Sequence, residues 1–235
     1  LTMGRIHKIV YKKLMMYYIF MIILAVDSSS KDLSLSLKIE EDLETKIYQK
    51  DGRHSEIFLE ALNDLVENNI QVADLSVILF NKGPASFTGT RVAASSLQAI
   101  GYSLNIPVIG ISSLEVMAHV YSRDSDIRKF DCAKYAYGNN YFTASFAKVK
   151  KLRQTKSTSL AEIQMINASH DEHLIINTEL SRHLDNNDLS ITLDHTILKH
   201  ETDSEDLISY AEKYVDFADE FNLSYTLPDY ANHEI

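Results

Sequence analysis

The sequence predicts an α/β protein in which mixed sheets are flanked by helices, and three consecutive segments indicate this class. Residues 77–80, Val-Ile-Leu-Phe, form a short β-branched and aromatic run that is typical of a buried strand. Residues 91–104 carry apolar positions among many small residues and predict a helix that can approach a neighbour closely. Pro107 then opens a second apolar run, 108–111. A strand, a helix and another strand in this order indicate layers of helix and sheet.

Composition limits the classes of protein that remain. The chain has 235 residues and 45% hydrophobic content, enough for one large domain or two lobes. The chain has 23 Lys and Arg and 33 Asp and Glu, a net charge of -10. This charge argues against direct, strong binding to the phosphate backbone of a nucleic acid. Cys132 is the only cysteine, so no intrachain disulfide forms and a reducing cytosol is expected. A structural role for this thiol is favoured over catalysis.

The first 20 residues differ from the rest of the chain. They contain Arg5, Lys8, Lys12 and Lys13, and no acidic residue precedes Asp27. Basic residues before an apolar run imitate a signal peptide, but the run is too short to span a bilayer and Val-Asp-Ser at 26–28 is a poor cleavage site. We interpret residues 1–20 as an N-terminal extension, with the first strand beginning at Met21.

The remaining elements follow from periodicity. Residues 33–37 alternate as a half-buried strand, residues 45–48 continue as a third strand, and residues 54–68 form a helix with one broad apolar stripe. Further along we expect a helix from Ser112 to about 121, a hairpin of 130–135 and 141–148, a short helix after Ser159, strands at 174–176 and 189–193, and a last helix at 206–221.

Two motifs have alternative chemical readings. Glycines ahead of a helix could cradle phosphate, but Gly83 and Gly89 enclose five residues and no lysine follows, so a plain strand-to-helix connection is favoured. The two imidazoles of His-Asp-Glu-His at 170–173 could share a metal ion on a helix, but neither a His-Glu-x-x-His pattern nor a His-x-x-x-His pair is present, and an exposed polar turn is favoured.

The loop and the strand after it carry a family resemblance. The segment Gly-Pro-Ala-Ser-Phe-Thr-Gly-Thr-Arg at 83–91, followed by Ile-Pro-Val-Ile-Gly-Ile-Ser-Ser-Leu at 106–114, resembles the signature of the TsaB (YeaZ) family. The family pattern reads GPGSFTGLR, so Ala85 and Thr90 are departures. The motif residues that match are Gly83, Pro84, Ser86, Phe87, Thr88, Gly89 and Arg91. The resemblance runs from Met21 nearly to the C-terminus and is strongest up to about 119.

The resemblance implies a two-lobed fold of the actin, Hsp70 and sugar-kinase type. We expect a first lobe at 21–107 closed by a helix at 202–222, a second lobe at 108–201, and a tail at 223–235. In this superfamily the first strand ends at an Asp followed by a glycine-containing phosphate turn. Asp27 is followed by three serines and no glycine. This favours a structural role for the turn over the phosphate binding that a working ATPase needs.

The resemblance also implies a function. A TsaB-like chain is a non-catalytic subunit that pairs with TsaD and, with the TsaE ATPase and with TsaC, supports threonylcarbamoylation of adenosine 37 in tRNAs reading ANN codons. It implies a cytoplasmic protein with no cofactor, no metal and no membrane contact, which touches tRNA only through the complex and forms a homodimer when alone. The rival readings are an ATPase or kinase of the same fold, and a peptidase.

The apolar stripe of the helix at 54–68 and the small-residue face of the helix at 91–104 can serve either a core or a partner. In the family these two helices pair with TsaD. We therefore expect an interface made by Ile57, Phe58, Ala61, Leu62, Ala93, Ala94 and Leu97.

Overall fold

The structure is a computed structural model, and its element order is that of a two-sheet α/β protein. No helix among the described residues has the length and apolar character needed to cross a bilayer. The described residues are 20–49, 54–67, 69–85, 87–126, 129–137, 140–147, 150–151, 156–159, 173–186, 195–197, 201–215 and 217.

The first sheet has five strands in the order β3-β2-β1-β4-β5. β1, β2 and β3 form an antiparallel meander, and β4 and β5 add to β1 in parallel. The parallel part requires a crossover, which the helix between β4 and β5 supplies. The bounds are β1 Ile22–Asp27, β2 Leu33–Ile39, β3 Asp42–Tyr48, β4 Val77–Gly83 and β5 Val108–Ser112.

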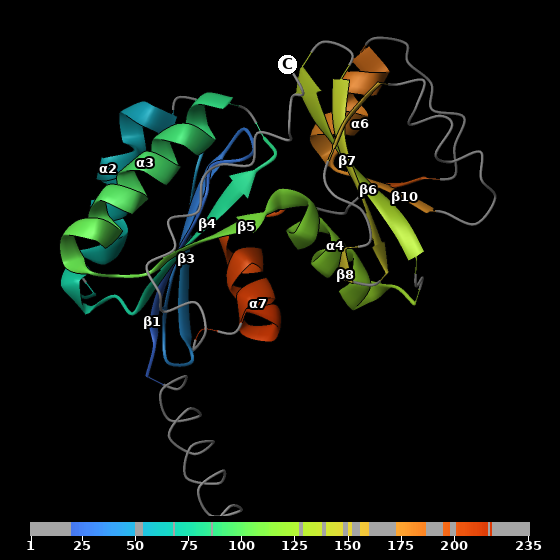
Figure 1. Cartoon of the computed structure of the whole chain (residues 1–235). Coiled ribbons are helices and arrows are strands. Elements are labelled where there is room, and N and C mark those ends of the chain that lie inside the picture. Colours follow the sequence, from blue (N-terminus) through green and yellow to red (C-terminus); the bar gives the residue numbers. More distant parts are fainter. Residues whose placement is uncertain are drawn as a thin grey trace, which may run out of the picture.

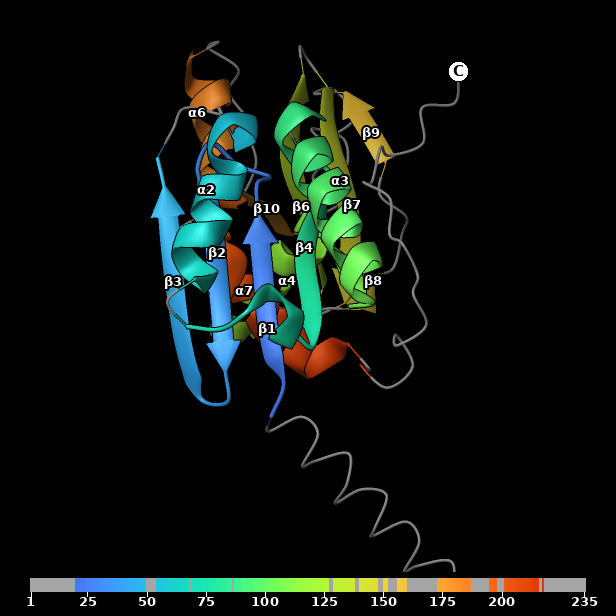
Figure 2. The same ribbon diagram turned by 90° about the vertical axis from the view of Figure 1, so that its left-hand side faces the viewer.

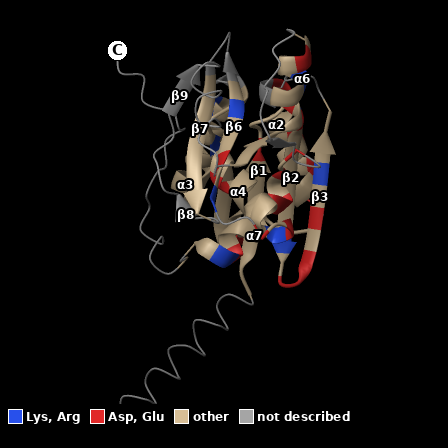
Figure 3. Ribbon diagram, turned by 90° about the vertical axis from the view of Figure 1, so that its right-hand side faces the viewer, with Lys and Arg blue, Asp and Glu red and all other residues tan. Residues whose placement is uncertain are grey.

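Helices cover both faces of the first sheet (Figures 1 and 2). α2 (His54–Val66) and α3 (Phe87–Leu104) lie side by side on one face, and the short 3-10 helix η1 (Val72–Asp74) precedes β4. α7 (Ser204–Tyr214) covers β1, β2 and β4 on the opposite face. Figure 3 shows β3 at an outer edge of this sheet, with acidic residues gathered at its hairpin end.

The second sheet is ordered β11-β10-β6-β7-β8, and β9 also pairs with β7. α6 (Thr178–Asn186) packs on it through Leu180 and Leu184, and α4 (Ser113–Asp124) lies between the two sheets and contacts α7 (Figure 1). The bounds are β6 Lys129–Tyr137, β7 Asn140–Ala147, β8 Lys150–Lys151, β9 Lys156–Ser159, β10 His173–Ile176 and β11 His195–Ile197.

The two larger apolar clusters of the described residues form the core of the first lobe and its junction with the second. One lies under α2 and α3 and is built from Leu24, Leu35, Phe80 and their neighbours. The other joins the opposite face of the first sheet to α4, α7 and the second sheet, so the two lobes share one continuous core.

The boundary between the lobes differs from the expected one. β5 pairs with β4 in the first sheet, so the first lobe extends to Ser112 and not only to residue 107. The sequence signal at Pro107 marks the start of a strand, and a strand start says nothing of which sheet receives the strand. The expected helix after Ser159, the strand at 189–193 and the chain after residue 217 lie outside the described residues.

Candidate functional site

Asp27 ends β1 and lies buried between the lobes. Its exposed fraction is 1%. Oδ1 accepts a hydrogen bond from the backbone N–H of Ser29 at 2.7 Å, and Oδ2 accepts one from Asn81 Nδ2 at 2.7 Å. Both carboxylate oxygens are therefore bound by the chain's own donors.

Asn81 lies in β4, beside Asp27, because β1 and β4 are parallel neighbours whose carboxyl ends meet at the same edge of the sheet. Its Nδ2 also donates to Ser29 Oγ at 2.9 Å. Its Oδ1 accepts from Ser113 Oγ at 2.6 Å and from the Gly83 N–H at 3.0 Å. One amide thus connects the turn after β1, the end of β4 and the start of α4.

Lys134 brings the second lobe into this network. It comes from β6, it is only 2% exposed, and its Nζ donates to Ser29 Oγ at 3.3 Å. Burial raises the pKa of Asp27, and the positive charge of Lys134 opposes that rise. We name the residues Asp27, Ser29, Asn81, Ser113 and Lys134 the interlobe network.

The interlobe network has the properties of a structural polar cluster. Asp27, Ser29, Asn81 and Lys134 are each at most 2% exposed and hydrogen-bond to one another. Buried charges in proteins persist when they are paired and hydrogen-bonded. Within the described ranges, no group of three or more His, Cys, Asp and Glu side chains is placed to hold a metal ion.

The motif loop begins at the same edge of the sheet. Gly83 has φ of 92°, a conformation that favours glycine, and the Gly83–Pro84 peptide bond is cis. The N–H of Gly83 is bonded to Asn81, so this amide is not directed at an anion. Ser86 and the side chains of Phe87 and Thr88 lie outside the described part of the chain, whereas Gly89 is buried and Arg91 is exposed on α3.

The predicted partner interface requires a correction. The structure places six of its seven residues in the core between the two helices and the sheet, and each is at most 5% exposed. The seventh, Ile57, is partly buried against the same core. The apolar stripe faces inward because it packs on the apolar face of the first sheet and is removed from water there. The six buried residues are Phe58, Ala61, Leu62, Ala93, Ala94 and Leu97.

Other side chains form the outward surface of these helices. Leu59 on α2 is 68% exposed and Tyr102 on α3 is 75% exposed. Leu104, at the end of α3, is 40% exposed. Large apolar side chains on exposed helices indicate a contact surface when they gather there. Leu59 and Tyr102 are the residues that the sequence pattern missed, since they are not among the apolar positions expected to be buried.

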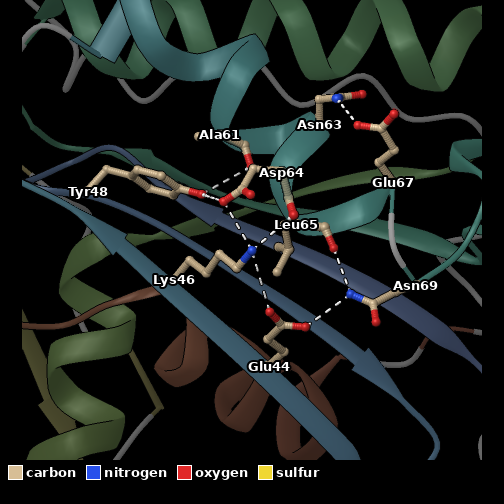
Figure 4. Close-up of polar contacts among 9 residues, drawn as sticks. All are labelled: Glu44, Lys46, Tyr48, Ala61, Asn63, Asp64, Leu65, Glu67 and Asn69. Atoms are coloured by element: carbon tan, nitrogen blue, oxygen red, sulfur yellow. Dashed lines mark hydrogen bonds and ion pairs between the residues drawn. The ribbon is translucent and has the colours of Figure 1, made fainter.

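A hollow of about 500 Å³ lies between α2 and β3. Tyr48 donates to Asp64 Oδ2 at 2.7 Å and Lys46 Nζ donates to the same oxygen at 3.0 Å (Figure 4). These two donors lower the pKa of Asp64, whereas burial and Asp64 raise the pKa of Tyr48. The hollow is therefore polar on one side. Its lining is Tyr48, Ile57, Glu60, Ala61, Asn63, Asp64 and Glu67.

Two further candidates are accounted for by packing. Cys132 is fully buried in β6, and burial raises the pKa of its thiol well above the ordinary value, which disfavours the nucleophilic thiolate. His173 opens β10 and stacks on Tyr121, while residues 170–172 lie outside the described ranges.

The folded architecture defines the class of protein. One solved structure, titled as an uncharacterised Pseudomonas aeruginosa protein with similarity to peptidase YEAZ, matches with a TM-score of 0.69, 19% identity and cover of 90% of this chain and 100% of that chain. A Bacteroides thetaiotaomicron protein described as having an actin-like ATPase fold matches with a TM-score of 0.51, 8% identity and cover of 82% and 97%. The chain therefore has the actin-like fold.

Sequence comparison finds similar proteins that share one description. TsaB from Bacillus subtilis is 36% identical over 101 residues, which are 42% of this chain and 44% of the relative. TsaB from Buchnera aphidicola of Acyrthosiphon pisum is 27% identical over 130 residues, 55% of this chain and 59% of the relative. Both are described as tRNA threonylcarbamoyladenosine biosynthesis protein TsaB, and the chain is similar to these TsaB proteins over the matched residues.

Two facts describe the extent of these matches. The family model described as "TsaD: tRNA N6-adenosine threonylcarbamoyltransferase" matches residues 49–130, about a third of the chain. The chain spans about half the length of the curated relatives that it matches.

Proposed function

We propose that this chain is a non-catalytic subunit that pairs with a TsaD-like catalytic subunit in the synthesis of N6-threonylcarbamoyladenosine at position 37 of tRNAs reading ANN codons. The observation that carries the proposal is the interlobe network. Asp27, at the end of the first strand, has both oxygens bound by internal donors, and the cation of Lys134 lies beside it. A carboxylate held in this way supports a structural role over a catalytic one.

The proposed pairing surface is the outer surface of α2 and α3, represented by Leu59 and Tyr102. These side chains are more than two thirds exposed, and burial of such apolar area drives association. In this proposal the chain needs no cofactor of its own, and tRNA is reached only through the assembly with the TsaD-like and TsaE-like proteins. The net charge of -10 supports an indirect contact with RNA.

Reconstitution tests the proposal. The chain is mixed with a TsaD-like subunit, a TsaE-like ATPase, a TsaC-like enzyme, ATP, threonine, bicarbonate and tRNA, and modified nucleoside is measured by mass spectrometry after digestion. We expect modification only when this chain and the TsaD-like subunit are both present. Full modification without this chain would reject the activating role.

Two charge substitutions test the surface. Leu59→Glu and Tyr102→Glu should weaken binding of the TsaD-like subunit by tenfold or more, because a carboxylate would lose its hydration in the interface. Ile47→Glu is the matched control, since Ile47 is also an exposed apolar residue but lies in β3, away from α3. Equal binding by all three variants would reject this surface.

Calorimetry with Mg-ATP separates the proposal from the ATPase or kinase alternative. We expect no binding by the isolated chain. Micromolar binding, together with hydrolysis that Asp27→Ala abolishes, would favour the enzyme.

A further inference from the structure

The two lobes meet in an apolar layer and a polar layer. In the apolar layer, α4 lies between the two sheets and contacts α7, β4, β5, β6 and β7 (Figure 1). Burial of apolar surface is non-directional, and packed helices can slide on one another by small amounts. Hydrogen bonds, in contrast, need particular distances and angles. The polar layer is therefore the part of the contact that selects one orientation of the lobes.

Two chain crossings lie beside the polar layer. The first joins β5 to α4, where Ser113 Oγ donates to Asn81 Oδ1 at 2.6 Å. The second leads from β11 to α7 and includes residues 201–203. At a crossing, the covalent chain keeps the lobes together in any orientation.

Glu201 ties the second crossing to the second lobe. Its Oε1 accepts a hydrogen bond from the backbone N–H of Glu179 at 2.8 Å, and its Oε2 accepts one from Asn177 Nδ2 at 3.0 Å, both at the start of α6. Three residues later, the N–H of Ser204 donates to Ser34 Oγ in β2 at 2.9 Å. Four consecutive residues therefore connect α6 of the second lobe to β2 of the first.

Lys134 joins the lobes at a place where the chain does not cross. It lies within β6, is 2% exposed, and its Nζ donates to Ser29 in the turn after β1. Burial raises the pKa of Asp27 in the first lobe and of Glu179 in the second, and the cation of Lys134 opposes both rises. One buried ammonium group thus interacts with carboxyl groups of both lobes.

We propose that Lys134 is a latch that fixes the orientation of the second lobe on the first, and that loss of its ammonium group lets the lobes turn about α4 and the two crossings. Glu201 holds the second crossing in either state, whereas Lys134 holds the turn after β1 against β6. The latch acts within this chain, so it does not depend on the proposed pairing with a TsaD-like subunit.

Spin-label distances between the lobes test the latch. Labels are attached after Glu60→Cys in α2 and Asp185→Cys in α6, two exposed positions on different lobes (Figure 1). Cys132 is buried and the pKa of its thiol is raised, so it does not compete for the label. Double electron–electron resonance should give one narrow distance distribution for the labelled chain. Adding Lys134→Met should broaden this distribution or add a second peak.

A second variant separates a latch from a charge that only stabilises the fold. Asp27→Asn together with Lys134→Met leaves no uncompensated carboxylate at residue 27, so cooperative melting should be recovered. No ammonium group then joins β6 to Ser29, so the distance distribution should remain broad. Lys129→Met is the matched control, because Lys129 lies in the same strand but is exposed, and it should leave the distribution narrow.

The outcomes decide the proposal. Broad distributions in both Lys134 variants, with a narrow one in Lys129→Met, support the latch. A double variant that melts cooperatively and keeps the narrow distribution would overturn it, because the shared apolar core would then be enough to fix the lobes. A broad distribution in the labelled chain without further substitution, or equal broadening by Lys129→Met, would also overturn it.

Discussion

Replacement of Lys134 by Met tests the energetic role of the interlobe network. The substitution keeps most of the side-chain volume and removes the cation that lies beside Asp27 and bonds Ser29 at 3.3 Å. Removing one partner of a buried charge pair leaves the other charge uncompensated, at a cost of about 3–5 kcal/mol. We expect Lys134→Met to lower the free energy of unfolding by an amount in this range.

The pH dependence gives the change a specific signature. The pKa of Asp27 is already raised by burial, so the folded state holds this proton more firmly than the unfolded state does. Stability from this group is therefore present at low pH and is lost as pH rises through the raised pKa. Without the cation the pKa rises further, and the difference between Lys134→Met and wild type should grow with pH.

Urea denaturation followed by circular dichroism at several pH values measures both effects. The double variant Asp27→Asn with Lys134→Met removes the uncompensated carboxylate charge of Asp27 and should recover most of the lost stability at neutral pH. The reasoning is refuted if Lys134→Met unfolds at the wild-type urea concentration, or if Asp27→Asn rescues nothing.

Three further predictions concern other parts of the fold. Burial lowers the pKa of His119 to about 4, so protonation of this imidazole opposes folding. Relative to His119→Gln, wild type should lose about 2.5 kcal/mol of stability between about pH 6.5 and pH 4, measured by urea titration. Gly101→Ala should cost about 1–3 kcal/mol, because the added Cβ would lie 2.7 Å from the carbonyl oxygen of Ile106; an unchanged melting temperature would contradict this. Leu97→Asp should abolish the cooperative melt, because Leu97 is fully buried, whereas Tyr102→Glu should melt as wild type does.

The strands and helices of the first lobe were predictable because their periodicity is strong. The run at 77–80 and the helix ending at Leu104 are found in the structure, although α3 starts four residues earlier than expected. The fold class is confirmed by the actin-like neighbours. Boundaries were less predictable, since the same Pro107 signal fits a strand in either sheet.

The interlobe network could be predicted only in part. Asp27 was identified from its place after the first strand, and the same reasoning applied to the parallel strand at 77–80 would have selected Asn81. Lys134 gave no such signal, because it is a lysine in a hairpin strand, where lysines usually face solvent. Its burial depends on the packing of one lobe against the other, which no local pattern encodes.

The interface was mispredicted for a physical reason. An apolar stripe shows that a helix buries one face, but it does not show whether a sheet of the same chain or another protein covers that face. Leu97 is fully buried under the sheet, while Tyr102, on the same helix, is exposed.

The position of α7 has a consequence for synthesis on the ribosome. Ser36 in β2 bonds Ser204 at the start of α7 across 168 residues of sequence, and α7 covers one face of β1, β2 and β4. At elongation rates of about 5–20 residues per second, the interval between translation of Ser36 and translation of Ser204 is about 8–34 s. Until α7 is made, the apolar face formed by Ile23, Ala25 and Leu79 lacks one of the two helices, α4 and α7, that pack against it. The first lobe to be synthesised is thus among the last parts to be completed, and a nascent chain stalled before residue 204 should bind holdase chaperones that the released chain does not.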